Sequence, residues 1–454
     1  MSVLRWVLAA ILLIATPLPA LAHSSTRGFV LLLPTGYVIF SGALVVLVSF
    51  IVVSTLKSSS SSLRLRPAAQ RHSNAVLPSV ISAIILGVAV SIGFTGPHDP
   101  AENLLPLMIW TLWWVIIVLL HPLFGDIWQT LNPFSGPARL ITRIFPPPLA
   151  FPVQLAYWPA LLIYAAFAWF QLVYPGPENP PRLALVVMLY VAGTMLAIMA
   201  FGHKTWLGKA DPFAVFLSQV GATAPRTGAG WTYPGAGLLS LAPLPAAGML
   251  FVLLTLSSIS FDGLANTFAW LAVIGINPLD YPGRTAVMLP NTLGLLGSFI
   301  LLAAVYVSAV CAGWAWAGKP VALGHLLGRL VLSLIPISIA YHLAHYLGDA
   351  LLNLQYTVLA LNDPLGSGEN LLGLAGMHVT ASFQNTAFGA LVLFSVQTVS
   401  VVLGHVVATV VAHAMAADTG LDRVTMMKLE APLAALMVLY TTFGLWLLAT
   451  PAIS

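Results

Sequence analysis

Apolar segments of about 20 residues recur along the whole chain, and few charges interrupt them. A helix needs about 20 apolar residues to cross a bilayer, where its backbone polar groups are hydrogen-bonded internally. Charged residues are 7% of the 454 residues, against roughly 25% in a soluble domain. The pattern predicts an all-α, polytopic protein of the lipid bilayer with about ten transmembrane helices. We expect them at 29–56, 76–95, 104–121, 151–173, 183–201, 237–259, 288–316, 330–357, 386–414 and 431–450.

The N-terminus has the three parts of a signal peptide. Arg5 ends a short basic region, residues 6–18 are apolar, and residues 20–22 read Ala-Leu-Ala, a small-x-small cleavage site. We therefore expect a signal peptide at 1–22 and one integral membrane domain at 23–454. An uncleaved anchor helix is the alternative.

Basic residues are distributed unequally between the two sets of loops. If the mature chain starts in the periplasm, most Lys and Arg residues fall on the cytoplasmic side, as the positive-inside rule requires. Only Arg27, Arg182 and Arg284 fall outside. The formal net charge of +4 thus reflects loop bias, and we expect no nucleic-acid partner. The predicted location is the bacterial inner membrane, with the mature N-terminus and the C-terminus periplasmic.

Several sequence motifs are missing from the chain. It has no phosphate-binding glycine loop, no G-x-S-x-G, no H-E-x-x-H and no C-x-x-C, and its one cysteine is Cys311. These absences argue against a nucleotide-driven pump and against an intrachain disulfide. The loop at 260–284 is unusual because it is too apolar for a plain loop and too short for two crossings. We expect a possible re-entrant segment there.

Polar residues interrupt the eighth apolar span. His342, His345 and Asp349 fall within about a 60° arc of one helix face, and Pro336 predicts a kink shortly before them. Ionisable groups in a membrane span cost several kcal/mol and usually mark a functional site. Two imidazoles and a carboxylate on one face suit a metal ion, or a carboxylate that orients a histidine. Hydrogen bonding to neighbouring helices is the structural alternative.

The ninth span carries a second polar group. His405 lies at a depth close to that of His342 and is a fourth candidate ligand, provided that the two helices touch. Gly404 would let a neighbouring backbone approach closely. Gln397 would match the level of His345, and His413 is expected to be solvated near the inner surface.

Two cytoplasmic segments are weakly alike. In each, a histidine at the end of a span precedes an aspartate and a Pro-Phe pair: His121 and Asp126 in the first, His203 and Asp211 in the second. An internal duplication would explain the likeness. We expect instead two amphipathic helices at the membrane surface, each capped by its aspartate.

Six segments spread over most of the chain suggest a family. They are HSSTRGFVLLLPTGY (23–37), FGDIWQTLNPF (124–134), GKADPFAVF (208–216), FDGLANTFAW (261–270), AYHLAHYLGD (340–349) and LGHVVATVVAH (403–413). Together they resemble bacterial integral membrane proteins known as fenitrothion hydrolases. The resemblance implies hydrolysis of an organophosphorus triester in the inner membrane, with or without a second membrane protein as subunit.

A metal-dependent hydrolase is therefore the first interpretation. A divalent metal would activate water and polarise a P=O bond, with His345 and Asp349 as catalytic residues. The predicted metal ligands are His342, His345, Asp349 and His405. The aromatic span of Trp110, Trp113 and Trp114 would admit a small lipophilic substrate from the bilayer.

Two other functions fit the same residues. A secondary transporter, or a metal or proton permease, would use an intramembrane His/Asp site for coupling. A structural subunit of a membrane complex would place the polar residues at a protein interface.

Overall fold

The computed structural model describes residues 35–55, 76–227, 230–374 and 376–451. In this part of the chain, ten helices are long and apolar enough to cross a membrane. The prediction of an all-α, multi-pass membrane protein is thus confirmed. The predicted signal peptide at 1–22 lies outside the described residues.

The first half of the chain contains five of these spans and several short helices. The spans are α2 (Thr35–Thr55), α4 (Val76–Thr95), the continuous α5 (Leu104–Pro106), η1 (Leu107–Ile117) and α6 (Val118–Phe124), then η2 (Val153–Leu155) with α9 (Trp158–Leu172), and α10 (Pro180–Phe201). The short helices are α7 (Trp128–Leu131), α8 (Ser135–Ile144), α11 (His203–Lys209) and α12 (Pro212–Gly221).

The second half begins with a two-stranded hairpin and contains the other five spans. The hairpin pairs β1 (Arg226–Thr227) with β2 (Gly230–Trp231) in antiparallel register. The spans are α13 (Ala246–Ala265), α15 (Arg284–Trp316), the run α16 (Leu323–Leu330), η5 (Val331–Leu334) and α17 (Ile335–Asn362), then α18 (Ala387–Ala417) and α19 (Arg423–Ala449). The short elements are η3 (Ala236–Ser240), α14 (Phe268–Val273) and η4 (Pro278–Asp280).

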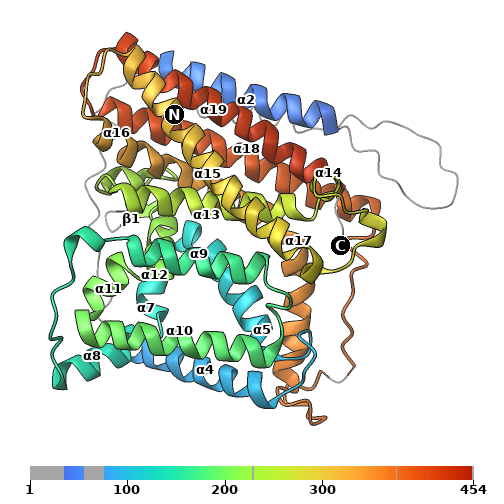
Figure 1. Ribbon diagram of the computed structural model, residues 1–454. Helices are drawn as coiled ribbons and strands as arrows, with labels where there is room; N and C mark the ends of the chain where they lie inside the picture. The colour runs from blue at the N-terminus through green and yellow to red at the C-terminus, as the bar shows by residue number, and fades with distance from the viewer. Residues whose placement is uncertain (1–34, 56–75, 228–229, 375, 452–454) are drawn as a thin grey trace, which may run out of the picture.

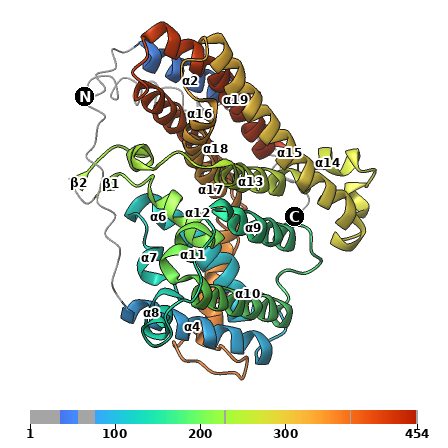
Figure 2. The same cartoon turned by 60° about the vertical axis from the view of Figure 1, so that its left-hand side comes forward.

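The helices form two groups, which both views show. In Figures 1 and 2, α2, α15, α18 and α19 lie together in the upper part, and α4 and α10 lie in the lower part beside α8 and α11. One apolar core lies among the upper helices, and a second joins η1, α9, α12 and α13. Helix α17 contacts α18 and α13 as well as η1, so it lies where the two groups meet.

Helix α13 differs from the expected span in register. The sequence predicted 237–259, but the helix begins at Ala246 and continues to Ala265. Polar residues near its end are accommodated, because the hydroxyl groups of Ser258 and Ser260 donate to carbonyls of their own helix. Asp262 also lies within it, in contact with His345 and Tyr346 of α17. The expected re-entrant segment at 260–284 consists of this helix end, α14, η4 and the start of α15.

The third and eighth spans have irregular backbones near the candidate site's residues. The central part of the third span, Leu107–Ile117, is a π-helix. The eighth span changes from the 3₁₀ turn η5 to α17 at Ile335, so Pro336 lies in the first turn of α17. Proline is tolerated there, because the first turn has no internal acceptor for its missing N–H. The chain thus changes its helical form beside Pro336, where the sequence predicted a kink.

Candidate functional site

A carboxylate–imidazole pair lies where α13 meets α17. The Nε2 atom of His345 is 3.1 Å from an Oδ2 atom of Asp262. The same oxygen accepts a hydrogen bond from the Tyr346 hydroxyl at 2.6 Å. Gln171 of α9 donates to the Tyr346 hydroxyl oxygen at 2.7 Å. The three helices are therefore joined by one chain of hydrogen bonds.

The two side chains of this pair are partly exposed. The side chain of His345 is 31% exposed and that of Asp262 is 15% exposed. Gly263 lies against His345, and a Cβ atom at this glycine would be 3.9 Å from Nδ1 of the imidazole. Asp262 is three residues from the end of α13, which corresponds to about 5 Å along a helix. Asp262 is thus within α13 but near its C-terminal end, whereas His345 lies well inside α17.

His342 is held by the π-helix. Its Nε2 atom is 2.7 Å from the backbone carbonyl oxygen of Trp114. Because a carbonyl only accepts, Nε2 carries the proton and donates it. The imidazole is buried and lies edge-on to the Trp114 indole, with ring centroids 5.3 Å apart. His342 therefore fixes α17 to η1.

A small polar cavity lies between these groups. It has a volume of about 10 Å³, and Ser258, Asp262, His342 and Tyr346 contribute to its walls. That volume is close to what one water molecule needs. The Tyr164 hydroxyl is 3.1 Å from Oγ of Ser258 at the same cavity. The polar side chains of α9, α13 and α17 thus converge on one point.

The predicted metal ligands do not meet. His405 is buried on another side of α17, with its ring 6.0 Å from that of Tyr341, and its Nδ1 donates to the Val401 carbonyl. Asp349 is exposed. Adjacent residues point about 100° apart on a helix, so Tyr341 and His342 face different neighbours. Within the described part of the chain, no three His, Cys, Asp or Glu side chains gather as metal ligands would. The divalent metal stays a prediction from the sequence.

The eighth and ninth spans are in contact, which was the condition for His405 to lie near His342. A Cβ atom at Gly404 would lie 2.4 Å from the Ala340 Cβ and 2.8 Å from the Pro336 carbonyl oxygen. The helices α17 and α18 therefore touch at this glycine. Gln397 donates to the Ala344 carbonyl at 2.7 Å, one residue from the predicted level.

The expectation that His413 is solvated is wrong. Its side chain is 7% exposed, and its Nδ1 atom is 3.0 Å from the Glu430 carboxylate, which is 4% exposed. The reason is that α19 begins at Arg423 instead of 431, with Asp422 as its N-cap. The longer helix carries Glu430 alongside the inner end of α18.

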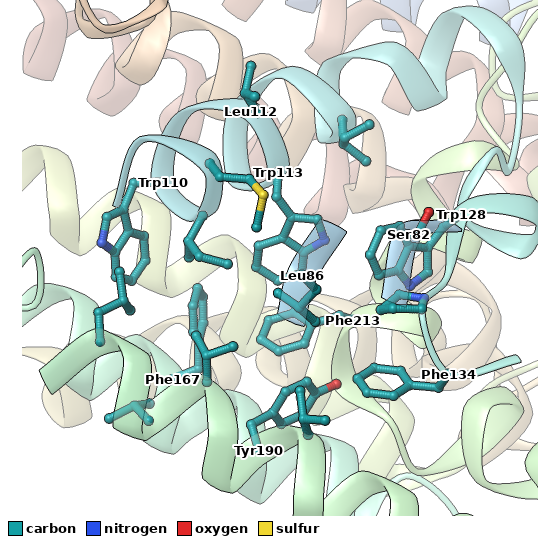
Figure 3. Close-up of a pocket in the computed structure, with 18 of the residues that line it drawn as sticks. Ser82, Leu86, Trp110, Leu112, Trp113, Trp128, Phe134, Phe167, Tyr190 and Phe213 are labelled. Carbon is teal, nitrogen blue, oxygen red and sulfur yellow. The ribbon is translucent and has the colours of Figure 1, made fainter. Parts of the chain in front are cut away.

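A large apolar cavity lies beside the polar one. Its volume is about 560 Å³, and spans α4, η1, α9 and α10 provide most of its walls. Figure 3 shows aromatic rings around it, including Trp113, Phe167, Tyr190 and Phe213. Of the three tryptophans singled out from the sequence, Trp110 and Trp113 line this cavity. Trp114 lines the polar cavity instead.

A buried aspartate lies behind the wall of the apolar cavity. Asp211 is 1% exposed, and its carboxylate accepts a hydrogen bond from the Tyr190 hydroxyl. The other oxygen caps α12 by accepting from the Ala214 amide at 2.8 Å. Burial raises the pKa of this carboxyl to about 6, although the hydrogen bond from Tyr190 opposes the shift. The predicted cap is confirmed, but α12 is buried along most of its length and is not a surface helix.

Sequence reasoning missed the main partner at the site. It named His345, but it placed Asp262 in an outer loop and did not identify Gln171. The available signal was Asp262 itself, an acidic residue inside a segment too apolar for a loop. Comparisons with protein-family models, curated proteins and solved structures find no match. The resemblance to fenitrothion hydrolases therefore stays a prediction.

Proposed function

We propose that this protein is a secondary transporter that couples proton movement at the Asp262–His345 pair to the passage of a small lipophilic molecule. The observation that carries the proposal is the 3.1 Å contact between this carboxylate and imidazole inside a membrane span. Ionisable groups there are costly, and those that are retained usually serve ion or proton movement.

The pair has the chemistry that proton coupling needs. An imidazole and a carboxylate in contact can hold one proton between them and release it when their surroundings change. In this proposal, the opening for protons is the part of the His345 side chain that is exposed, 31% of it. Tyr346 and Gln171 extend the hydrogen bonds away from that opening, toward α9. A proton on the pair would therefore change the contacts among three helices.

The backbones around the pair favour a conformational change. His342 of α17 donates to a carbonyl in the middle of the π-helix η1. The 3₁₀ turn η5 directly precedes α17. π-helical and 3₁₀ segments within α-helices often mark functional hinges, and discontinuous helices form substrate sites in many transporters. The two elements that meet at the site are thus suited to move against each other.

The apolar cavity is the candidate path for the transported molecule. Trp113 lines this cavity, while Trp114, the next residue, lines the polar one. The ring centroid of Phe167 is 4.8 Å from that of Trp114, and Phe167 also lines the apolar cavity. These aromatic side chains separate the two cavities. A ligand in the larger cavity would act on the proton site through this wall.

The proposed location is the bacterial inner membrane, with both ends of the mature chain on the periplasmic side. The excess of basic residues in the predicted cytoplasmic loops supports this orientation. In this orientation the Asp262–His345 pair would face the periplasmic side, because Asp262 falls in the predicted external segment at 260–284. A second membrane protein as subunit belongs to the same proposal and is suggested only by the family resemblance.

Uptake into proteoliposomes tests the proposal. Three radiolabelled probes cover the charge types of lipophilic molecules: tetraphenylphosphonium, tetraphenylborate and triphenyl phosphate. We expect at least one probe to accumulate when a pH gradient is imposed, and to accumulate no more than in protein-free vesicles when the gradient is collapsed. The proposal would be contradicted if no probe accumulated, or if accumulation were the same with and without the pH gradient.

Hydrolysis of an organophosphorus triester is the second candidate. One observation favours it: the partly exposed His345 is oriented by Asp262, as a general base for water would be. An enzyme of this kind releases product in detergent solution without any gradient. Release of phenol from triphenyl phosphate, lost in His345→Gln, would favour this candidate over transport.

A further inference from the structure

The apolar cavity has the size and walls of a ligand site. Its volume of about 560 Å³ is within the range of small-molecule pockets. Its lining residues include positions near the middle of α4, η1 and α9, so the cavity lies at membrane depth. Nine aromatic side chains contribute, from three spans, α7, α12 and the N-cap of α8. They are Trp110, Trp113, Trp128, Phe134, Phe167, Trp169, Phe170, Tyr190 and Phe213.

One acidic side chain lies directly behind the wall of the cavity. The Asp211 carboxylate is one hydrogen bond behind Tyr190, whose ring lines the cavity. Phe213, two residues further along, lines it as well. None of the ion pairs in the described part of the chain involves Asp211. The hydroxyl of Tyr190 and the Ala214 amide at the N-terminus of α12 donate to its carboxylate.

Helix capping alone does not require this charge. Asn and Ser cap helices about as well as Asp, and either residue would avoid the cost of burying a carboxylate. A buried acid beside an aromatic cavity is the arrangement that recognises an organic cation, because aromatic faces and a carboxylate both attract positive charge. The apolar walls require that the cation also carry bulky apolar groups.

From this arrangement we propose that the cavity binds lipophilic cations, such as bulky organic ammonium or phosphonium ions, with Asp211 as the counter-charge. The inference names the substrate class of the proposed transporter and in that respect rests on the proposed function. Binding itself requires neither transport nor the Asp262–His345 pair, so the two are tested separately.

The experiment compares two probes of nearly the same shape and opposite charge. Radiolabelled tetraphenylphosphonium and tetraphenylborate are equilibrated with the full-length protein in detergent, and partition into protein-free micelles is subtracted. We expect the cation to bind more tightly than the anion by about tenfold or more. Equal affinity would mean that the cavity accepts apolar molecules without regard to charge, and tighter binding of the anion would reverse the assignment. Either result overturns the inference, and so does the absence of binding.

Variants assign the charge to its residue. Asp211→Asn keeps an N-cap for α12 and should lower the affinity for tetraphenylphosphonium about tenfold. Asp126→Asn is the matched control, because Asp126 belongs to the similar segment but its carboxylate contacts Gln129 and His121, neither of which lines the cavity. Unchanged affinity in Asp211→Asn would overturn the inference. If that variant does not fold, Trp113→Leu should weaken cation binding, and the comparison of the two probes on the native protein still decides.

The two proposals fail in different ways. Cation binding without gradient-driven uptake would leave the cavity assignment intact and contradict transport. Gradient-driven uptake of an anionic or neutral probe alone would support transport and contradict the cation site.

Discussion

The imidazole of His345 and the carboxylate of Asp262 lie 3.1 Å apart, although they belong to helices that are far apart in sequence. This contact joins α13 to α17 where the two groups of helices meet. Tyr346 and Gln171 continue it into α9. A change of protonation at one pair therefore acts on three spans at once.

His342 should contribute to stability through its backbone contact. In His342→Leu the Trp114 carbonyl loses its donor, and we expect the free energy of unfolding to fall by about 1–2 kcal/mol. Thermal unfolding in detergent, followed by tryptophan fluorescence, measures the change. His325→Leu is the control, because His325 is exposed on α16. Equal melting temperatures for the two variants would show that the contact does not stabilise the fold.

Asp211 should make stability depend on pH. Burial raises the pKa of its carboxyl from 3.8 to about 6, so the folded state binds more protons than the unfolded state between these values. Stability therefore falls as the pH rises through this window, and the full cost, about 3 kcal/mol or less, is present above it. Asp211→Asn should melt at a higher temperature than the native protein at pH 8, with the difference shrinking toward pH 4.5. A difference that is constant with pH would contradict the assignment.

Gly404 should be irreplaceable at the contact between α17 and α18. A Cβ atom there would lie 2.8 Å from the Pro336 carbonyl oxygen, which belongs to a backbone and cannot turn away. We expect Gly404→Ala to destabilise the protein by about 1–3 kcal/mol. Gly193→Ala in α10 should be neutral or stabilising, since nothing lies within 4 Å of its added Cβ. Thermal unfolding of the two variants side by side checks this, and similar melting temperatures would refute it.

The existence of the spans could be predicted from the sequence, but not all of their ends. Hydropathy alone identifies ten apolar segments. The hydropathy pattern ended the predicted sixth span at 259 and began the tenth at 431. In both places an acidic residue, Asp262 or Glu430, was taken as part of a loop. Both acids belong to helices, since His345 and His413 of other helices offset the cost of burying them. Such offsets become visible only when the helices are packed.

For the same reason, only part of the candidate site could be predicted from the sequence. The helical period correctly placed His342 and His345 near one face of α17. It could not show that the His342 imidazole is already hydrogen-bonded to the Trp114 carbonyl. A backbone carbonyl that can accept a further hydrogen bond is not visible in a sequence. Matching depth suggested His405 as a neighbour, but depth does not fix the direction around a helix. His405 therefore faces Tyr341, away from the site.

Proton flux is the measurement that tests the central claim most directly. Proteoliposomes with a trapped pH-sensitive dye receive the probe that the native protein accumulates, and the internal pH is followed. We expect a flux with the native protein and with Glu369→Gln, whose carboxylate is exposed in the segment between α17 and α18. Asp262→Asn and His345→Gln should each lower this flux at least about tenfold. Native flux in both of these variants, at equal protein content, would contradict the account.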